Sequence, residues 1–270
     1  MRFREATALL ALLGPAALAA ESPVVDRFPN AAASYLVAVN GRVVWAHAPD
    51  TPLPPASLTK IMTALLVLEG GGKPDEWVRV SPRAAASTGT RLGLRAGDEI
   101  RAVDALTAAL VSSSNDACMA LAEHVAGSAP AFVERMNSRA SELGLASTHF
   151  ENPCGHDAPA HRSTARDLWT LTREALARAE FRRVVALERA EVRTRAGRAM
   201  TVVSGNALLG RAPGTTGVKS GFTPAAGKCV VARAERAGTE VVVVLLGAPD
   251  RWWTAAKMIE VSFDEARRGG

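Results

Sequence analysis

A serine and a lysine three residues apart are the first pair in this chain whose types and spacing could do chemistry. Ser57 and Lys60 lie in the segment Ala-Ser-Leu-Thr-Lys, at the start of an apolar run. Residues three apart are neighbours on a helix surface, so the Lys60 amine would lie beside the Ser57 hydroxyl. A serine hydroxyl is a weak nucleophile until a base removes its proton, and a neutral amine can do so. Such a pair also arises by chance on a solvated helix face, so its meaning depends on the rest of the chain.

Two further polar triplets follow along the chain. Residues 113–115 read Ser-Ser-Asn before a helical run, and residues 219–221 read Lys-Ser-Gly in a run typical of a strand. The ordered set SxxK, SxN and K[ST]G marks the penicillin-recognising serine enzymes. Residues 204–206, Ser-Gly-Asn, also fit SxN. They lie close before Lys219 and follow a strand-like run, so we interpret them as a structural turn.

The elements that must position these groups follow from local patterns. Asn40-Gly41 between two β-rich runs predicts a hairpin over residues 34–47. A helix is expected from Ser57, after the prolines of residues 52–55 and up to a glycine stop at 70–72. The region of about 73–207 is mainly helical, with helices expected near 103–126, 130–143 and 165–178 and a short hairpin from 190–194 and 200–203.

The last part of the chain returns to strands, expected at 217–223, 227–235 and 239–247, before a helix over 252–268. One face of that helix is apolar, which we interpret as a stripe packed on the sheet rather than a membrane-surface helix; it consists of Trp252, Ala256, Ile259 and Phe263. Strands at both ends with helices between them predict an α/β fold. We expect one antiparallel sheet flanked by helices, with a mainly helical lobe that forms a cleft.

The first twenty residues are typical of a secretory signal peptide. Arg2 and Arg4 precede an apolar run over 6–13, and small residues occupy 16–20. The run is too short to span a membrane. No cysteine lies near the cleavage point, so a lipid anchor is not predicted. We therefore expect an exported protein, periplasmic or secreted, with residues 21–270 as a single domain. A retained N-terminal anchor is the alternative.

The charge is mildly basic. Without Arg2, Arg4 and Glu5 the chain keeps 30 basic and 26 acidic residues, a net charge of +4. This balance suits attraction to an anionic polymer such as cell wall. Lys and Arg are scattered along the chain, so nucleic-acid binding has no support.

Three cysteines in an exported chain leave at least one without a partner in the chain. Cys118 lies in an apolar helical run and Cys229 in a strand-like run, so we expect both to be small core residues. Cys154 lies in a loop and is the expected reactive thiol. The spacing does not indicate a disulfide framework.

A cluster of possible metal ligands lies between residues 149 and 161. It consists of His149, Cys154, His156, Asp157 and His161. Its spacing lacks the helical histidine pair of the HExxH metalloproteases, so we expect no metal site and no cofactor.

With the three triplets in order, the chain resembles the serine D-alanyl-D-alanine carboxypeptidases, the low-molecular-mass penicillin-binding proteins. The resemblance covers about residues 23–263 and includes segments 56–63, 95–100, 110–117, 136–137, 143–145, 150–153, 163–168 and 217–223. It implies a β-lactamase/transpeptidase-like fold with one catalytic domain. It also implies peptidoglycan stem peptides as substrates and β-lactams as acylating inhibitors.

The resemblance implies catalytic roles for four residues. Ser57 would attack the carbonyl between two D-alanines and form an acyl-enzyme. Lys60 would take the Ser57 proton as a neutral amine, because burial and a second cation lower a lysine pKa. Ser113 would relay a proton to the leaving amine, and Asn115 would hold Lys60 and the substrate amide.

The same resemblance implies binding roles for the later strand. Lys219 and the Ser220 hydroxyl would bind the terminal carboxylate, and Gly221 would let the peptide lie against the strand edge. Backbone N–H groups of Ser57 and Phe222 would hold the oxyanion.

Several positions depart from the family pattern. Ser220 stands where threonine is commoner, and the usual Asn-Pro-His-Gly reads Asn-Pro-Cys-Gly, with Cys154 for histidine. A carboxylate-binding arginine of the family aligns with Thr254, and we expect Arg251, one turn earlier, to substitute. An additional β domain and a C-terminal anchor found in many relatives are not in this sequence, which favours a soluble enzyme.

The leading hypothesis is a DD-carboxypeptidase. A DD-endopeptidase that cuts cross-links with the same groups is the first alternative. A β-lactamase ranks lower, because the class A deacylating glutamate is not evident and the chain has no Leu-Asn pair. A non-enzymatic β-lactam-binding or wall-binding protein is the remaining alternative. The oligomeric state and the stem-peptide preference stay open.

Overall fold

The computed structural model describes residues 25–70 and 75–268. The predicted signal peptide, residues 1–20, lies outside the described residues, as does the end of the expected glycine stop. In chain order the elements are β1 (Ser34–Val39), β2 (Arg42–His47), the 3₁₀ turn η1 (Ala56–Thr59), α1 (Lys60–Glu69), β3 (Trp77–Arg79), α2 (Pro82–Ala85), β4 (Glu99–Arg101), α3 (Ala102–Val111), α4 (Asn115–Ala126), α5 (Ala129–Glu142), α6 (Ala165–Leu176), α7 (Ala179–Val185), β5 (Arg189–Arg193), β6 (Ala199–Val203), β7 (Thr215–Thr223), β8 (Gly227–Arg236), β9 (Thr239–Ala248) and α8 (Arg251–Arg268).

The main sheet is antiparallel and joins strands from distant parts of the sequence. Its order is β2-β1-β9-β8-β7, so the early hairpin pairs with the last strand, Ser34 opposite Leu246. The hairpin turns at Asn40 and Gly41, whose φ angles of 48° and 76° suit a two-residue turn. The predicted antiparallel sheet, completed by both ends of the chain, is confirmed.

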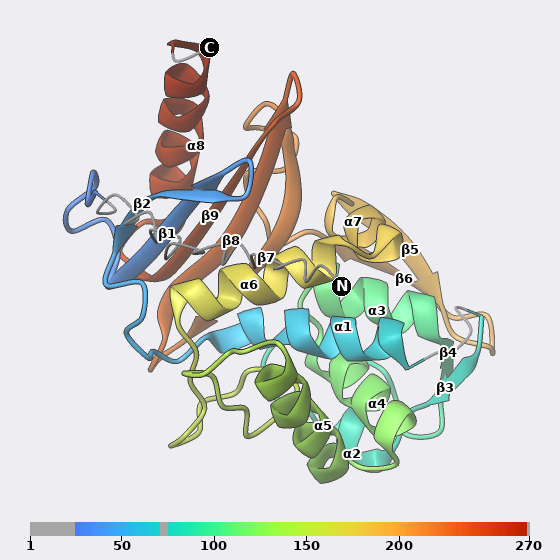
Figure 1. The fold of residues 1–270 in the computed structure, drawn as a ribbon. Helices are drawn as coiled ribbons and strands as arrows, with labels where there is room; N and C mark the ends of the chain where they lie inside the picture. The colour runs from blue at the N-terminus through green and yellow to red at the C-terminus, as the bar shows by residue number, and fades with distance from the viewer. Residues whose placement is uncertain (1–24, 71–74, 269–270) are drawn as a thin grey trace, which may run out of the picture.

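Both faces of this sheet are buried. Along β9, Val242, Val244 and Leu246 belong to the core shared with the helical lobe, whereas the residues between them belong to a second core under α8. A strand covered on both faces is apolar at every position, which explains the unbroken valine and leucine run of β9. Figure 1 shows α8 on one face of the sheet and α6 and α1 on the other.

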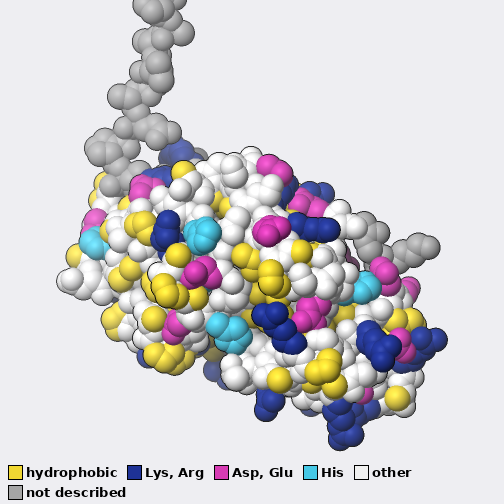
Figure 2. All heavy atoms as spheres, turned by 90° about the horizontal axis from the view of Figure 1, so that it is seen from below, with side chains coloured by type: hydrophobic (Ala, Val, Ile, Leu, Met, Phe, Trp, Pro, Cys, Tyr) yellow, Lys and Arg dark blue, Asp and Glu magenta, His cyan; other side chains and the backbone are white. Residues whose placement is uncertain are grey.

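Helix α8 packs on the sheet through the predicted stripe. Met258, Ile259 and Phe263 are buried there, and Trp252 and Ala256 pack beside them. None of the helices in the described ranges is both long and apolar enough to cross a membrane. On the face in Figure 2, Lys and Arg side chains are interspersed with Asp and Glu rather than gathered into one continuous stripe.

The expected single helix over 103–126 was wrong in one respect: it is two helices. Residues 112–114 separate α3 from α4, and Ser113 has a φ of 62°, in the left-handed region. Serine side chains compete for backbone hydrogen bonds and favour such breaks. Ser112 Oγ donates to the carbonyl oxygen of Ala108, four residues earlier, at 2.9 Å. The break places Asn115 at the first residue of α4. The short elements α2, α7, β3 and β4 had no periodic signal and were not predicted.

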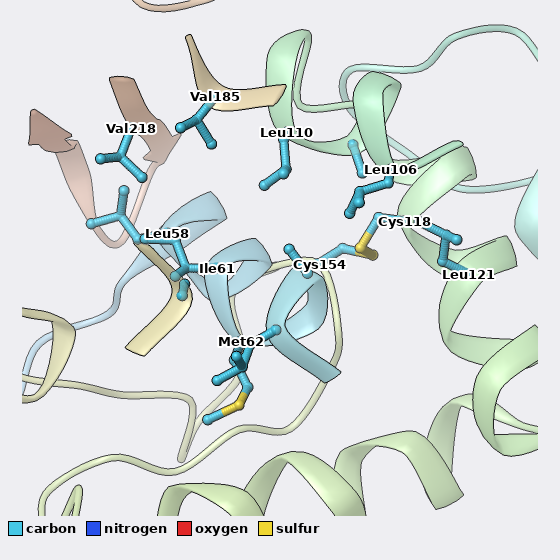
Figure 3. Close-up of a cluster of buried hydrophobic side chains, with 14 of the residues drawn as sticks. Leu58, Ile61, Met62, Leu106, Leu110, Cys118, Leu121, Cys154, Val185 and Val218 are labelled. Carbon is cyan, nitrogen blue, oxygen red and sulfur yellow. A yellow bond between two sulfur atoms is a disulfide. The ribbon is translucent and has the colours of Figure 1, made fainter. Parts of the chain in front are cut away.

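Cys118 is buried in the core as expected, but the predictions that Cys154 is a reactive thiol and that no disulfide forms were wrong. Cys118 of α4 and Cys154, both buried, form a disulfide across 36 residues of sequence (Figure 3). Cys154 is therefore not a reactive thiol. Loop and helix patterns show nothing of the tertiary packing that brings these two residues together. Cys229 is the free cysteine in the core, as expected, and burial raises the pKa of its thiol to about 11.

Candidate active site

The turn that holds Ser57 is packed between two glycines. Ala56, immediately before Ser57, has a φ of 48°. A Cβ atom on Gly155 would lie 1.9 Å from the Ala56 carbonyl oxygen, and one on Gly221 would lie 2.8 Å from the Ser57 nitrogen. Only residues without a side chain allow this close approach of three backbone segments. Ser57 therefore lies where the loop after α5, the edge of β7 and the start of α1 meet.

The Lys60 amine is fully buried beside Ser57. Its Nζ lies 3.0 Å from Ser57 Oγ and donates to Asn115 Oδ1 and the Cys154 carbonyl, each at 2.7 Å. Burial, and then the charge of Lys219, holds the Lys60 pKa well below its usual range. A neutral amine has two N–H donors and one lone pair. With both donors directed to carbonyl oxygens, the lone pair is left to accept the Ser57 proton.

The break between α3 and α4 brings Asn115 to Lys60, with Ser113 two residues before it in the chain. Asn115 Oδ1 accepts from Lys60, and its Nδ2 donates to the Thr88 carbonyl at 2.7 Å. This second bond fixes which way the Asn115 amide faces. Ser113 is partly exposed in the left-handed turn just before Asn115.

The lysine triplet lies on β7, an edge strand that pairs only with β8 in the described chain. Lys219 is buried, and its Nζ donates to the Ser220 carbonyl at 2.7 Å. Burial and the nearby Arg251 charge lower the Lys219 pKa to about 7. Ser220 Oγ donates to the Gly205 carbonyl at 3.3 Å, and Phe222 is 62% exposed. The free strand edge next to Ser57 can therefore accept an extended peptide as a further strand.

Arg251 lies at the start of α8 and reaches β7. Its Nη1 donates to the Gly221 carbonyl at 2.5 Å. Its Nε is buried and has no hydrogen-bond partner in the described structure. Desolvation lowers the Arg251 pKa from its usual value. The charge of the guanidinium also lowers the Lys219 pKa, so the two cations interact.

The second SxN triplet forms a turn. Ser204 Oγ accepts from the Asn206 N–H at 3.2 Å, and Asn206 Oδ1 accepts from the Leu208 N–H at 3.1 Å. Its middle residue, Gly205, nevertheless receives the Ser220 hydroxyl bond. The turn therefore borders the site through its backbone, a contact that the sequence pattern does not reveal.

The buried His161 supports the turn that holds Ser57 through a chain of hydrogen bonds. It was not predicted as a site residue. The Glu151 N–H donates to His161 Nδ1 at 3.0 Å, so the proton lies on Nε2, which contacts Thr59 Oγ1 at 2.8 Å. Thr59 Oγ1 in turn donates to the Ala56 carbonyl at 2.8 Å. Desolvation by burial lowers the His161 pKa from 6.5 to about 4, so the ring is neutral at pH 7. One histidine in a polar segment carries no sequence signal for this role.

Three of the five residues weighed as metal ligands have other partners. Cys154 is in the disulfide, His161 bonds Thr59, and Asp157 accepts from Thr223 Oγ1 at 2.5 Å. Within the described ranges, His, Cys, Asp and Glu form no group of three or more that could hold a metal ion.

A serine hydroxyl, a buried amine beside it and a free strand edge are the parts that acyl transfer to a serine requires. Residues 22–250 match the family model described as D-alanyl-D-alanine carboxypeptidase. The chain belongs to this family, and the predicted family and fold are confirmed.

Three relatives illustrate the match. D-alanyl-D-alanine carboxypeptidase DacF of Bacillus subtilis is 33% identical over 83% of this chain and 60% of its own length. The D-alanyl-D-alanine endopeptidase of Pseudomonas aeruginosa is 34% identical over 77% of this chain and 68% of its own length. The crystal structure of the Streptomyces K15 DD-transpeptidase aligns with a TM-score of 0.81 and 29% identity, over 90% of this chain and 98% of that one. The chain thus spans less than two thirds of the length of DacF.

Replacing Gly155 by alanine tests the packing of the Ser57 turn. Gly155 and Gly197 have φ angles of 86° and 87°, but a Cβ at Gly197 meets nothing within 4 Å. Both substitutions carry the strain of about 1–2 kcal/mol for a left-handed alanine. Gly155→Ala also forces the Ala56 backbone to move, so we expect it to destabilise by about 1–3 kcal/mol more. Urea unfolding of the two variants measures this difference, and equal losses would contradict the close packing.

The neutral His161 predicts a specific pH dependence of stability. Its folded pKa, about 4, is below its unfolded value of 6.5, so its contribution is fully present above pH 6.5. As pH falls from 6.5 to 4, only the unfolded chain gains a proton, and about 3 kcal/mol is lost. Urea unfolding at pH 7 and pH 4.5 should show a larger loss in the wild type than in His161→Gln. An equal loss in both proteins would mean that His161 is not held neutral.

Proposed function

We propose that this protein is a serine DD-peptidase that hydrolyses the D-Ala-D-Ala bond of peptidoglycan stem peptides through an acyl-enzyme on Ser57. The observation that carries this proposal is the buried Lys60 amine, 3.0 Å from Ser57 Oγ, with its two N–H groups bonded to carbonyl oxygens. Membership of the carboxypeptidase family supports the same activity.

Acylation begins when Lys60 accepts the Ser57 proton. Ser57 Oγ then attacks the carbonyl carbon between the two D-alanines. The oxyanion accepts hydrogen bonds from the backbone N–H groups of Ser57 and Phe222. Ser113 relays the proton from Lys60 to the leaving nitrogen, so the C–N bond breaks and D-alanine departs as a neutral amine. Water then attacks the ester carbonyl carbon and gives a proton to Lys60. The bond between the acyl carbon and Ser57 Oγ breaks, and Lys60 passes the proton to Ser57 Oγ, which restores the hydroxyl.

The peptide binds along the free edge of β7, where Gly221 leaves room for its backbone. Its terminal carboxylate meets Lys219, the Ser220 hydroxyl and Arg251. Arg251 replaces the family arginine because its guanidinium already lies on β7, 2.5 Å from the Gly221 carbonyl. Asn115 holds the substrate amide as well as Lys60. In this arrangement the two cations select a peptide with a free C-terminal carboxylate.

Cleavage of cross-links is a second candidate activity. The Pseudomonas aeruginosa relative, 34% identical, is named an endopeptidase. A cross-linked peptide presents the same D-Ala carbonyl to Ser57. A β-lactamase activity has less support, because the partners of Lys60 in the described structure are Ser57, Asn115 and Cys154, without a carboxylate.

The substrate lies outside the cytoplasmic membrane, so we propose that residues 1–20 direct export to the periplasm or beyond.

Acylation of Ser57 by a labelled penicillin tests the central assignment. We expect mass spectrometry of the digested protein to locate one acyl group on Ser57, and Ser57→Ala to form no adduct because the nucleophile is gone. Ser138→Ala on α5 is the matched control and should acylate like the wild type. In parallel, loss of one D-Ala from pentapeptide muropeptides indicates carboxypeptidase action, and conversion of dimers to monomers indicates endopeptidase action. Rapid penicillin turnover without peptide cleavage would instead indicate a β-lactamase, and no adduct at Ser57 would overturn the proposal.

The lysine pKa values predict the pH profile of peptide hydrolysis. Lys60 must be neutral, and Lys219, with a pKa of about 7, must be protonated to bind the carboxylate. We therefore expect kcat/KM to fall as pH rises above about 7; this fall is the alkaline limb of the profile. The fall in kcat should occur at higher pH, because a bound carboxylate stabilises the Lys219 ammonium.

Removing the Arg251 charge should move this limb. Arg251→Gln raises the Lys219 pKa, so the alkaline limb of kcat/KM should shift to higher pH while KM increases. Lys257→Gln, an exposed cation on the same helix, should change neither quantity. An unmoved limb in Arg251→Gln would show that the guanidinium does not act on Lys219.

A further inference from the structure

The two carbonyl groups that accept from Lys60 belong to segments that one disulfide joins. Asn115 is the first residue of α4, and Cys118 lies one turn later on the same helix. Cys154 supplies the second carbonyl and is bonded through its sulfur to Cys118. Figure 3 shows this bond beside the buried residues of α1 and α3. The Cys154 acceptor thus belongs to the ring that the disulfide closes, and the Asn115 acceptor lies three residues before that ring on the same helix.

The hydrogen bonds of the loop do not by themselves attach it to α4. Asn152 Oδ1 accepts from the N–H groups of Cys154, Gly155 and His156, at 3.2, 2.7 and 3.0 Å. Thr63 Oγ1 donates to the Pro153 carbonyl at 2.5 Å. The contacts of residues 152–155 with α4 are made by the two sulfur atoms, with Cys118 Sγ 3.3 Å from the Pro153 carbonyl oxygen and Cys154 Sγ 3.7 Å from the Asn115 carbonyl oxygen. A disulfide sulfur has no proton to donate, so the hydrogen bonds of residues 152–155 in the described structure run within the loop and to α1. The covalent connection to α4 is the disulfide.

We propose that the Cys118–Cys154 disulfide is a positioning element for the general base. It holds the Cys154 carbonyl at a fixed place relative to Asn115, so the two Lys60 donors stay engaged and the lone pair faces Ser57. This inference rests on the proposed function. It also gives a role to the departure Asn-Pro-Cys-Gly, in which Cys154 stands where the family pattern has histidine.

Small displacements of this loop should have large effects on reactivity. If the Cys154 carbonyl moves away, one N–H of Lys60 loses its acceptor and the amine can turn from Ser57. A misplacement of about 1 Å in a reacting group can cost on the order of 100-fold in rate. Movement of the loop also admits water to the buried amine, which weakens the desolvation that keeps Lys60 neutral. Protonation of Lys60 makes the acylation rate fall toward low pH, and we call this fall the acid limb. The rate constant and the acid limb should therefore change together.

The test compares the double variant Cys118→Ala/Cys154→Ala with Cys229→Ala, which removes a buried thiol elsewhere. The measurement is the second-order rate constant of acylation by a fluorescent penicillin as a function of pH, at temperatures below each unfolding midpoint. For the double variant we expect a rate constant lower by about 10-fold or more and an acid limb at higher pH. Cys229→Ala should match the wild type in both. Lys219 and His156, the titratable groups that interact with Lys60 in the described chain, are unchanged in both variants.

A purely stabilising disulfide would lower the unfolding midpoint without moving the acid limb. A double variant with the rate constant and the acid limb of the wild type would therefore overturn the proposal. So would the alkylation of three thiols in the unfolded, unreduced wild type, because it would mean that no disulfide is present. If the double variant does not fold, the folded Cys229→Ala protein is reduced with a phosphine and its acylation is measured before and after reoxidation. Reversible loss supports the proposal, and unchanged acylation with both thiols free overturns it. Failure of the wild type to acylate at Ser57 would instead contradict the proposed function itself.

Discussion

The burial of the Lys60 amine without a counter-charge is the constraint on which this site depends. A buried ammonium costs several kcal/mol, and a carboxylate partner would offset that cost by keeping the proton on the lysine. Lys60 instead donates to two carbonyl oxygens, and its pKa is lowered by burial and by the cation of Lys219, which together favour the neutral amine. A base that is ready at neutral pH therefore requires four separate segments to meet around one nitrogen atom and exclude water.

The fold brings these segments together by close backbone packing. The start of α1 lies against β7 on one side and the loop after α5 on the other, and glycine at 155 and 221 permits the approach. The α3–α4 break adds Asn115 from the helical lobe, and the disulfide links that helix to the loop. Peptide substrate would meet this assembly from the free edge of β7, so recognition and chemistry share one strand.

The sequence predicts the parts of this site that depend on local spacing. Ser57 and Lys60 are brought together by one helical turn, and Lys219 to Phe222 lie on one strand, so their arrangement follows from short patterns. Short patterns do not predict contacts between segments that are distant in sequence. Three such contacts were missed: the Cys118–Cys154 disulfide, the hydrogen bond between His161 and Thr59, and the hydrogen bond between Ser220 and Gly205. Residues 113–115 were placed before a helical run, but the apolar residues on both sides do not reveal the left-handed turn at Ser113.

The pairing of β1 with β9 has a consequence for how the chain reaches its folded state. β1 ends at Val39 and its partner strand begins at Thr239, so the centre of the sheet cannot close until nearly the whole polypeptide is available. Contacts of such sequence separation slow folding, because a long loop must be ordered before they form. Strand β1 therefore stays without its partner β9 until the C-terminal part of the chain has been made.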